Sequence, residues 1–342
     1  MPEVSVIFFS YNQAGFVAEA LVSVLDQAYH DFEVIVADDG SIDGTDKVID
    51  EVLRHHPKSH LARRLEKTPN LGLISNWNRA VHAASGKILV TQAGDDVSHP
   101  DRLSTILRTF ETSARCMAVF SQVKVINARG DVVIQGFEQG RPIPESYGFD
   151  GLTDGFSFWK NAPILGACGA YRSELAKLFP PITSARSEDQ PYVYRALLLG
   201  HVCYTPETLL QWRWHGANLS VGSLSDESDS EKALTRRAAM SFARHQAASQ
   251  YEADALHALR HTHISSGRYD QEMSRIAANR CIELLAGLSV SPNHGWSEWM
   301  NEASEVIRRN ELSARSLAYA LRCALKKMMP TSLKLRYSRT LR

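Results

Sequence analysis

The sequence predicts an α/β fold in which a Rossmann-like, mostly parallel sheet is flanked by helices and followed by a helical C-terminal extension. Short apolar, β-branched runs recur at residues 4–10, 32–37 and 87–92, as expected for buried strands. Amphipathic helical patterns separate these runs. Strands that alternate with helices form βαβ units, so the sheet should be parallel with right-handed crossovers.

The elements of the first hundred residues follow from their own patterns. The run 4–10 is continuously apolar, which predicts a buried strand. Helices are predicted at 16–27, 46–55 and 77–84, the last of them ended by Gly86. Further strands are predicted at 32–37 and 87–92, with a weaker one at 66–69. In parallel sheets, ligands bind beyond the carboxyl ends of the strands, so the residues that follow each strand become the candidate site.

The second hundred residues are less regular. A strand at 116–126, a turn at 128–131 and a partner strand at 132–135 are expected, followed by a long loop at 136–163 that is rich in Gly, Pro and aromatic residues. Helices are predicted at 175–179 and 191–199, and an edge strand at 201–205. The sequence then becomes polar and acidic at 223–231. We therefore expect a domain boundary near residue 224, with a helical region at 224–342.

Composition excludes several classes of protein. The chain has 342 residues, 44% of them hydrophobic and 22% charged, which is ordinary for a globular protein. Lys and Arg together number 38, as do Asp and Glu, so the charge balance gives no reason to expect nucleic acid as a partner. The five cysteines are scattered, which excludes a Cys-rich zinc module and argues for a reducing compartment. No signal peptide or membrane span is recognisable, so a cytoplasmic protein is expected.

Three pairs of neighbouring acidic residues stand at predicted strand or helix ends. Asp38-Asp39 follows the second strand, and a strand-end Asp can accept a hydrogen bond from a nucleobase N–H or simply form a turn. Asp95-Asp96 follows the third clear strand, where a divalent cation would relieve their repulsion; a solvated turn is the alternative. Glu188-Asp189 opens a predicted helix, so its charge is also explained by the helix dipole.

Four segments in this order resemble family-2 glycosyltransferases over residues 4 to 220. They are SVIFFSYNQAGFVAEALVSVLDQ with FEVIVADDGSIDGT, NLGLISNWNRAVHAASGKILVTQAGDDVSHPDRL, SEDQPYVYRALLLGHVCY, and WRWHGANLS. The resemblance implies a GT-A fold at residues 1–223, with a nucleotide-donor half at 1–100 and an acceptor half at 101–223. It also implies an inverting transfer of sugar from a nucleotide-sugar, UDP-sugar being the expected donor, to a glycan or lipid-linked glycan in polysaccharide biosynthesis.

The resemblance also implies roles for individual residues. Ser10 and Tyr11 would border the nucleobase, and Asp38 would accept its imide N–H. Asp96, together with Asp95, would hold a Mn²⁺ or Mg²⁺ ion on the donor diphosphate, and His215 would lie near the metal. Asp189 would be the catalytic base, taking the proton of the acceptor hydroxyl.

One departure from the family pattern bears on the metal. The acidic turn of the family usually reads Asp-x-Asp-Asp, whereas this chain has Ala93-Gly94-Asp95-Asp96. Metal binding is therefore expected to depend more than usual on Asp96. Ala93 is also the one feature that supports a non-catalytic, donor- or glycan-binding partner of another transferase. A sugar nucleotidyltransferase is a further alternative, but the Gly-rich phosphate loop that it would need is missing after the first strand.

The last segment is basic. After Glu311 there are eight Lys or Arg residues and no Asp or Glu. Leu317, Leu321, Leu325 and Met328 would line one face of a helix there. Such a helix can lie on an anionic membrane surface, which would suit a lipid-linked acceptor, or it can pack on the protein with its basic face in water.

Overall fold

The computed structural model describes residues 1–135, 146–148, 165–215, 218, 230–261, 263–290, 297, 301 and 304. The chain divides into two compact units: Met1–Thr153 with Ser157–Ala217, and Asp154–Phe156 with Asn218–Arg342. The predicted boundary near residue 224 and the basic segment after Glu311 both lie outside the described residues.

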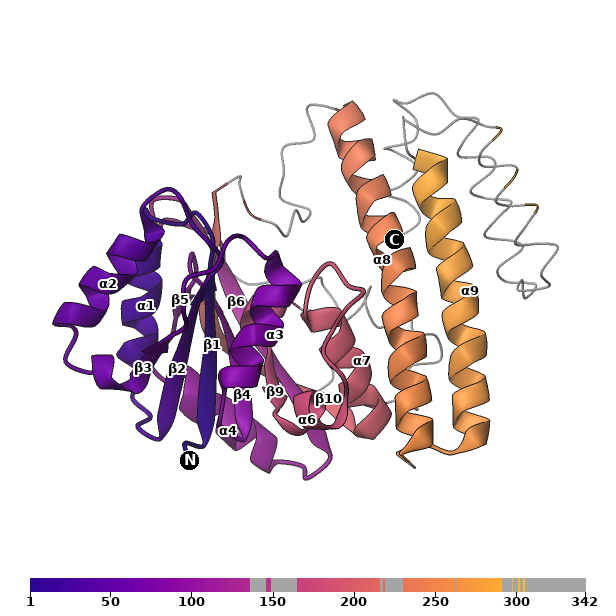
Figure 1. Ribbon diagram of the computed structural model, residues 1–342, viewed down its shortest axis with the longest axis horizontal. Coiled ribbons are helices and arrows are strands. Elements are labelled where there is room, and N and C mark those ends of the chain that lie inside the picture. The colour runs from indigo at the N-terminus through magenta and orange to yellow at the C-terminus, as the bar shows by residue number, and fades with distance from the viewer. Residues whose placement is uncertain are drawn as a thin grey trace. The chain divides into compact units, whose positions relative to one another are not determined.

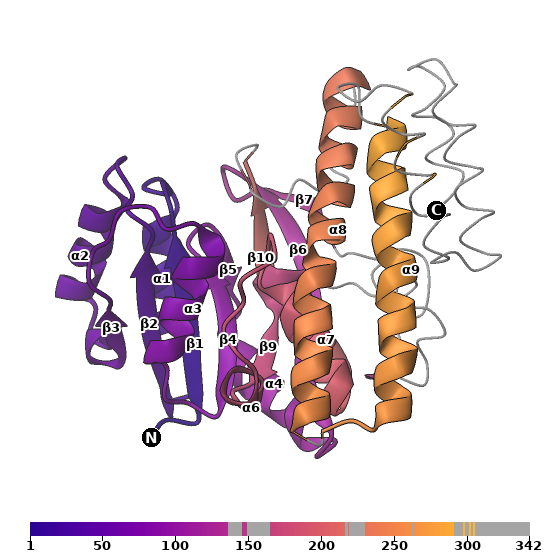
Figure 2. The ribbon, with the colours of Figure 1, turned by 45° about the vertical axis from the view of Figure 1, so that its right-hand side comes forward.

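The first unit is built on one sheet that is flanked by helices, as Figures 1 and 2 show. Within the described residues the strand order is β3-β2-β1-β4-β9-β6-β10-β5, with β7 beside β6 and β8 beside β10. The strands are β1 (Val4–Ser10), β2 (Phe32–Asp38), β3 (Ala62–Arg64), β4 (Ile88–Ala93), β5 (Val97–Ser98), β6 (Cys116–Asn127), β7 (Val132–Ile134), β8 (Ser146–Gly148), β9 (Ala170–Arg172) and β10 (His201–Trp214).

The long strands pair in parallel and the short ones run against them. The series β3-β2-β1-β4 is parallel throughout, and so is the pair β6-β10. The short strands β5, β7, β8 and β9 pair antiparallel with their neighbours. The predicted α/β class, with a mostly parallel sheet, is therefore confirmed.

Helices pack on both faces of this sheet. They are α1 (Val17–Leu25), α2 (Thr45–His55), α3 (Leu73–Ala83), α4 (Arg102–Glu111), α6 (Glu174–Leu178) and α7 (Asp189–Leu199), with short 3₁₀ turns η1 (Ser59–Leu61) and η3 (Gly166–Cys168). The predicted helices at 16–27, 46–55, 77–84, 175–179 and 191–199 correspond to α1, α2, α3, α6 and α7. Helix α3 begins four residues earlier than predicted, and α7 two residues earlier.

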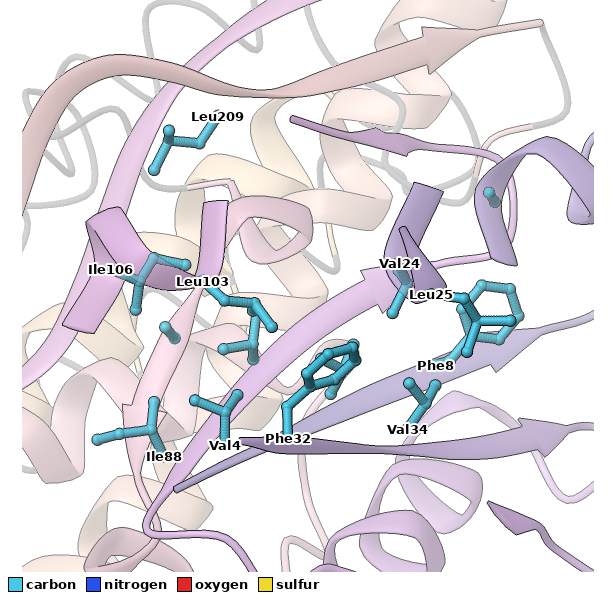
Figure 3. Packing of buried hydrophobic residues seen from close by; sticks show 14 of the residues in the cluster. Val4, Phe8, Val24, Leu25, Phe32, Val34, Ile88, Leu103, Ile106 and Leu209 are labelled. Atoms are coloured by element: carbon cyan, nitrogen blue, oxygen red, sulfur yellow. The ribbon is translucent and has the colours of Figure 1, made fainter. Parts of the chain in front are cut away.

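The main core lies between the sheet and helices α1 and α4. Figure 3 shows Val4, Phe8, Val34 and Ile88 of the parallel strands packed with apolar residues of these helices, including Val24, Leu25, Leu103 and Ile106. Alternate residues of a strand point to the same face, so β1 contributes every second side chain to this layer. Each fully buried aliphatic or aromatic side chain contributes about 1.5–3 kcal/mol of transfer free energy. This packing fixes the ends of β1, β2 and β4 in one place.

The opposite face of the sheet is covered by α3. Trp77 of this helix is fully buried, with its ring centroid 6.2 Å from that of Phe9, and Asn76 Nδ2 donates to Ala37 O at 2.8 Å. Trp77 also meets Tyr171 and Tyr192 in edge-to-face contacts at 6.4 and 5.5 Å. This aromatic cluster joins α3 to β9 and α7.

Two strand predictions were wrong. Residues 66–69 form no strand; the chain pairs with β2 earlier, through Ala62–Arg64. Residues 201–205 are the beginning of a longer strand, β10, which has β6 on one side and β5 and β8 on the other, so it is not an edge. Pro206 lies within this strand. It is tolerated because the register with β6 shifts between Thr205 and Thr208, leaving Pro206 and Glu207 exposed.

The sheet brings together two cysteines that are distant in sequence. Cys116 at the start of β6 and Cys203 near the start of β10 are joined as a disulfide, with Cα atoms 6.0 Å apart. Their separation of 87 residues concealed the pairing, which the parallel register of β6 and β10 brings about.

The described part of the second unit consists of two long helices, α8 (Ser230–Arg260) and α9 (Ser266–Val290). They lie side by side, as Figures 1 and 2 show. Small residues of α8 such as Ala248 and Ala255 are buried. Arg280 of α9 pairs with Glu252 of α8 at 3.0 Å, and His245 Nδ1 lies 2.9 Å from Arg280 O. No helix of the described residues is sufficiently long and apolar to cross a membrane.

Candidate functional site

Asp38 is held by hydroxyl and amide groups at the end of β2. Ser10 and Asp38 are opposite residues of the pair β1-β2, and Ser10 Oγ donates to Asp38 Oδ1 at 2.9 Å. Ser41 donates twice, from its Oγ to Oδ1 at 2.6 Å and from its N–H to Oδ2 at 2.9 Å. The carboxylate is therefore fixed in orientation at the edge of the sheet, with acceptor capacity remaining on Oδ2.

Tyr11 directly follows Ser10, on the loop after β1. Its side chain is 45% exposed, which is unusual for a large ring next to a buried strand. The loop is kept in shape by Asn12, which adopts a positive φ of 51° and is tied to the next loop through its N–H to Ser41 Oγ and its side chain to Ile42 N–H. The tyrosine thus presents an exposed aromatic ring on the loop that follows Ser10, the residue that donates to Asp38.

Asp39 and Asp43 support the loops around Asp38. Asp39 is buried and accepts from the N–H groups of Leu71 and Gly72, just before α3. Asp43 accepts from Ala14 N–H and from Thr45. Burial acts to raise the pKa of Asp43, but the hydrogen bonds from Thr45 and Ala14 outweigh it and lower the pKa. Both side chains connect loops that are distant in sequence.

The turn that carries Asp95 and Asp96 lies against the end of β1. Gly94 N–H donates to Phe9 O at 2.9 Å, and a Cβ on Gly94 would lie only 2.9 Å from Ser10 Cβ. A glycine is required here because any side chain would enter β1. The close approach brings the Asp95-Asp96 turn together with Ser10, and through Ser10 with Asp38.

The two aspartates of this turn have different surroundings. Asp95 Oδ2 lies 3.0 Å from His215 Nε2, and the ring of His215 stacks on Phe16 with centroids 4.7 Å apart. Asp96 is 1% exposed; its Oδ1 accepts the Arg213 N–H at 2.8 Å, and its Oδ2 has no hydrogen-bond partner among the described residues. Burial, followed by the neighbouring charge of Asp95, raises the pKa of Asp96 well above its usual range.

Arg213 has a structural role in the strand that carries His215. It is buried, with its Nε donating to Asp95 O, its Nη1 to Asn127 O and its Nη2 to Glu19. An arginine that alternates with tryptophans in a strand would commonly face solvent, but this side chain is buried. Instead it fastens the Asp95-Asp96 turn to β10 and α1.

The donor set of this turn suits a hard cation that has further oxygen ligands. No group of three or more His, Cys, Asp or Glu side chains with metal-binding spacing occurs in the described part of the chain. Asp95 with His215 offers one carboxylate and one imidazole, and the buried Asp96 Oδ2 has no partner among the described residues. Mg²⁺ and Mn²⁺ sites commonly use one or two carboxylates and complete their coordination with phosphate oxygens and water. The residues present fit such a cation bound together with a diphosphate.

Glu188 and Asp189 form a carboxyl pair at the beginning of α7. Asp189 Oδ1 accepts from Ser187 Oγ at 2.5 Å and from Gln190 N–H at 2.8 Å. Burial, together with the charge of Asp189, raises the pKa of Glu188 to about 8. Burial also raises the pKa of Asp189, and hydrogen bonds from Ser187 and Gln190 oppose the rise. The two groups titrate as a pair that retains a proton at neutral pH, which is the property of a tuned acid–base site.

Several residues of the site were not identified from the sequence. Ser41 fixes Asp38, Arg213 fixes the acidic turn, and Thr91 and Arg102 contact the segment facing Asp189. Ser41 had a signal, because Ser after Asp-Asp-Gly is a typical turn residue. Arg213 had none, since an arginine that alternates with tryptophans in a strand is more often exposed. All seven predicted site residues (Ser10, Tyr11, Asp38, Asp95, Asp96, Asp189 and His215) fall on described residues of the first unit.

Comparison with known proteins identifies the family. The model of "Glycosyl transferase family 2" matches residues 5–179. An uncharacterized glycosyltransferase of Nostoc sp. is 30% identical over 232 residues, which are 67% of this chain and 70% of that protein. The chondroitin synthase of Pasteurella multocida is 29% identical over 137 residues, 40% of this chain but only 14% of that longer protein.

A solved structure supports the same fold. TarS 1–349 of S. aureus, crystallised with UDP-GlcNAc, superposes with a TM-score of 0.58 at 18% identity, covering 99% of this chain and 92% of that one. At this identity the likeness concerns the fold, which is that of the GT-A glycosyltransferases. With the family model spanning half of the chain and a relative aligned over two thirds of it, this protein belongs to glycosyltransferase family 2 and is a glycosyltransferase.

Proposed function

We propose that this chain transfers a sugar from a UDP-sugar to a hydroxyl group of a glycan, with inversion at the anomeric carbon and with Asp189 as the general base. The observation that carries the proposal is the carboxyl pair formed by the buried Glu188 and the partly exposed Asp189. It is tied through Gly166 to Thr91 of β4, the strand that leads into Asp95 and Asp96. The proposed general base and the turn proposed to bind the diphosphate are therefore both connected to β4.

The nucleotide would bind at the ends of β1 and β2. In the proposed complex, Asp38 Oδ2 accepts the imide N–H of uracil, while Tyr11 provides an aromatic surface for the flat base. Ser10 and Ser41 hold the carboxylate in place before the nucleotide arrives, so little ordering is needed on binding. The UDP-GlcNAc bound by the fold neighbour TarS supports UDP as the nucleotide.

The diphosphate would lie at the Asp95-Asp96 turn. Asp95 and His215 would hold a Mn²⁺ or Mg²⁺ ion there, since Asp95 is the aspartate beside the imidazole. The resemblance had implied Asp96 as the main ligand, together with Asp95 and with His215 near the metal. Asp96 then supports the turn from within, through the Arg213 N–H. When bound, such an ion supplies charge stabilisation for the departing diphosphate.

Asp189 would act on the acceptor. Its carboxylate takes the hydroxyl proton as the oxygen attacks the anomeric carbon, and the bond from that carbon to the β-phosphate oxygen breaks to release UDP. A single displacement of this kind inverts the anomeric configuration. Glu188, which keeps a proton at neutral pH, prevents two adjacent negative charges from forming in the same buried site. The relation to chondroitin synthase supports a glycan as the acceptor.

The test uses release of UDP, because it requires no knowledge of the acceptor. Wild-type protein is incubated with Mn²⁺ and a panel of UDP-sugars, and UDP formed by transfer to water is measured. Asp189→Asn should lower the rate about 10²- to 10⁴-fold, the usual contribution of a general base, while calorimetry shows unchanged UDP affinity. The exposed Asp101, whose side chain makes no capping bond, provides the matched control Asp101→Asn.

Two results would contradict the proposal. A normal rate in Asp189→Asn would remove this residue as the base. UDP binding without turnover of any sugar in the panel, with acceptor glycans included, would favour the non-catalytic partner for which Ala93 argues.

A further inference from the structure

The turn η3 contacts the carboxyl pair of α7 very closely. A Cβ placed on Gly166 would lie 2.9 Å from Glu188 Oε1 and 3.3 Å from both Cβ and Cγ of Asp189. The backbone of Gly166 also hydrogen-bonds Asp189 and so favours its ionised form. Gly166 therefore forms one wall of the site in which both carboxyl groups lie, and it has no side chain to separate them from the backbone.

Thr91 holds η3 in place by donating hydrogen bonds to carbonyl oxygens in and just after this turn. Its Oγ1 donates to Gly166 O at 2.6 Å and approaches Gly169 O at 2.9 Å, while its N–H donates to Gly169 O at 3.0 Å. Thr91 is fully buried within β4, between β1 and β9. A valine would fill the same space in a strand, so the hydroxyl serves the turn and not the packing of the sheet.

Arg102 completes the same connection from α4. Its Nη2 donates to Thr91 O at 2.8 Å and to Ala167 O at 3.0 Å, and its Nη1 donates to Gln92 Oε1 at 2.8 Å. Burial lowers the pKa of Arg102 to about 10, so the guanidinium remains charged at neutral pH and its hydrogen bonds are charge-assisted. Gln92 Nε2 in turn donates to Asp96 O at 2.8 Å. Arg102 thus contacts η3 directly and the acidic turn through Gln92.

We propose that Gly166, held by Thr91 and Arg102, is a positioning residue that sets the location of the Asp189 base relative to the Asp95-Asp96 turn. The inference rests on the proposed function and deepens it. A hydroxyl attacks productively only within a narrow range of distance and angle. A rigid link between the base and the diphosphate site therefore raises the rate of the chemical step, but it does not strengthen the binding of either ligand. Two conditions follow: disturbing the link should lower kcat, and it should leave the affinity for UDP unchanged.

The experiment compares three variants with the wild type. Gly166→Ala places a methyl group against both carboxyl groups, Thr91→Val removes the hydroxyl at constant shape, and Thr91→Ser keeps it. We expect Gly166→Ala and Thr91→Val to lower kcat for UDP release by about 10- to 100-fold, as misplacements of this size do. Thr91→Ser should retain activity within a few-fold. The Kd of UDP with Mn²⁺ should change less than twofold in all three.

A pH profile separates positioning from a general loss of structure. In Thr91→Val the Gly166 hydrogen bond to Asp189 is loosened, so the acid limb of kcat should move upward by about 0.5 to 1 pH unit. Gly267→Ala is the matched control, since a methyl group there would meet no atom within 4 Å. It should leave kcat and the acid limb unchanged.

The outcomes distinguish this inference from the function on which it rests. If wild-type protein turns over no UDP-sugar, the proposed function fails and the positioning role fails with it. If Asp189→Asn is inactive but Gly166→Ala and Thr91→Val are normal, only the positioning role is overturned. It is also overturned if kcat and UDP affinity fall together, or if both variants unfold, because Thr91 and Gly166 would then be structural.

Discussion

Asp95 and Asp96 are adjacent in sequence, yet their surroundings assign them different tasks. The imidazole of His215 lies beside Asp95, whereas Asp96 is buried and receives the Arg213 N–H. The sequence could show that a carboxyl pair follows β4, because strand ends are recognisable. It could not show which of the two faces the histidine, since that depends on how β10, more than a hundred residues later, approaches the turn.

This difference leads to a prediction for metal dependence. Asp95→Asn should abolish the increase in UDP affinity that Mn²⁺ produces, because it removes the carboxylate beside His215. Asp96→Asn should retain most of the increase, since its Oδ1 contact with Arg213 N–H can be kept by the amide oxygen. Calorimetric titration of UDP with and without Mn²⁺ measures both, each tenfold change in Kd corresponding to about 1.4 kcal/mol. Loss of the metal effect in Asp96→Asn alone would return the metal to Asp96.

Elements were predictable where one sequence pattern was sufficient to define them. The observed ends lie within two residues of the predicted ends for strands β1, β2 and β4 and helices α1 and α2. Each of these elements buries a continuous or periodic apolar face, which the sequence shows directly. Strand β9 has three residues and depends entirely on β4 and β6 for its pairing. Strand β10 contains Pro206, which local rules treat as an ending. The position of each of these two strands depends on the strands beside it. The same is true of Arg213, which lies in β10, and of His215, which follows it.

The beginning of α3 illustrates such a dependence and can be tested. Its preceding residues Leu71 and Gly72 donate their N–H groups to Asp39, which is buried at the end of β2. Asp39→Ala should leave both donors without this partner and lower the free energy of unfolding by about 1–3 kcal/mol, the usual effect of removing a charged acceptor. Urea denaturation measures this loss. The control Asp101→Ala changes an exposed aspartate just before α4 and should have a small effect. Equal losses in both variants would contradict the role of Asp39.

At the scale of the whole molecule, buried carboxyl groups determine how stability responds to pH. Asp96, Glu188 and Asp189 all have raised pKa values in the folded protein. The folded state therefore binds more protons than the unfolded chain at pH values between the ordinary carboxyl range and the raised values. Under this condition the free energy of unfolding falls as pH rises. Glu33, Asp43 and Asp46 have lowered pKa values, so their contribution is lost only in acid, below about pH 4.

Glu188 gives this behaviour a measurable origin. Its folded pKa of about 8 lies above the ordinary value of 4.5, so its contribution to stability is fully present below pH 4.5 and is lost as pH rises from 4.5 through about 8. Glu188→Gln mimics the protonated form at every pH. We therefore expect wild-type stability to fall between pH 5 and 8, and the variant to fall less and to exceed the wild type at pH 8 by on the order of 2 kcal/mol.

Taking the difference between the two proteins isolates Glu188 from the other titrating groups. His201, for example, has a pKa lowered by burial and acts in the opposite direction, but it is present in both proteins. Urea denaturation at each pH, without UDP or metal, provides the two curves, and Glu174→Gln on the exposed side of α6 is the control that should follow the wild type. Parallel curves for wild type and Glu188→Gln would mean that Glu188 ionises as freely in the folded protein as in the unfolded chain. The carboxyl pair would then lack the burial on which the role proposed for it depends.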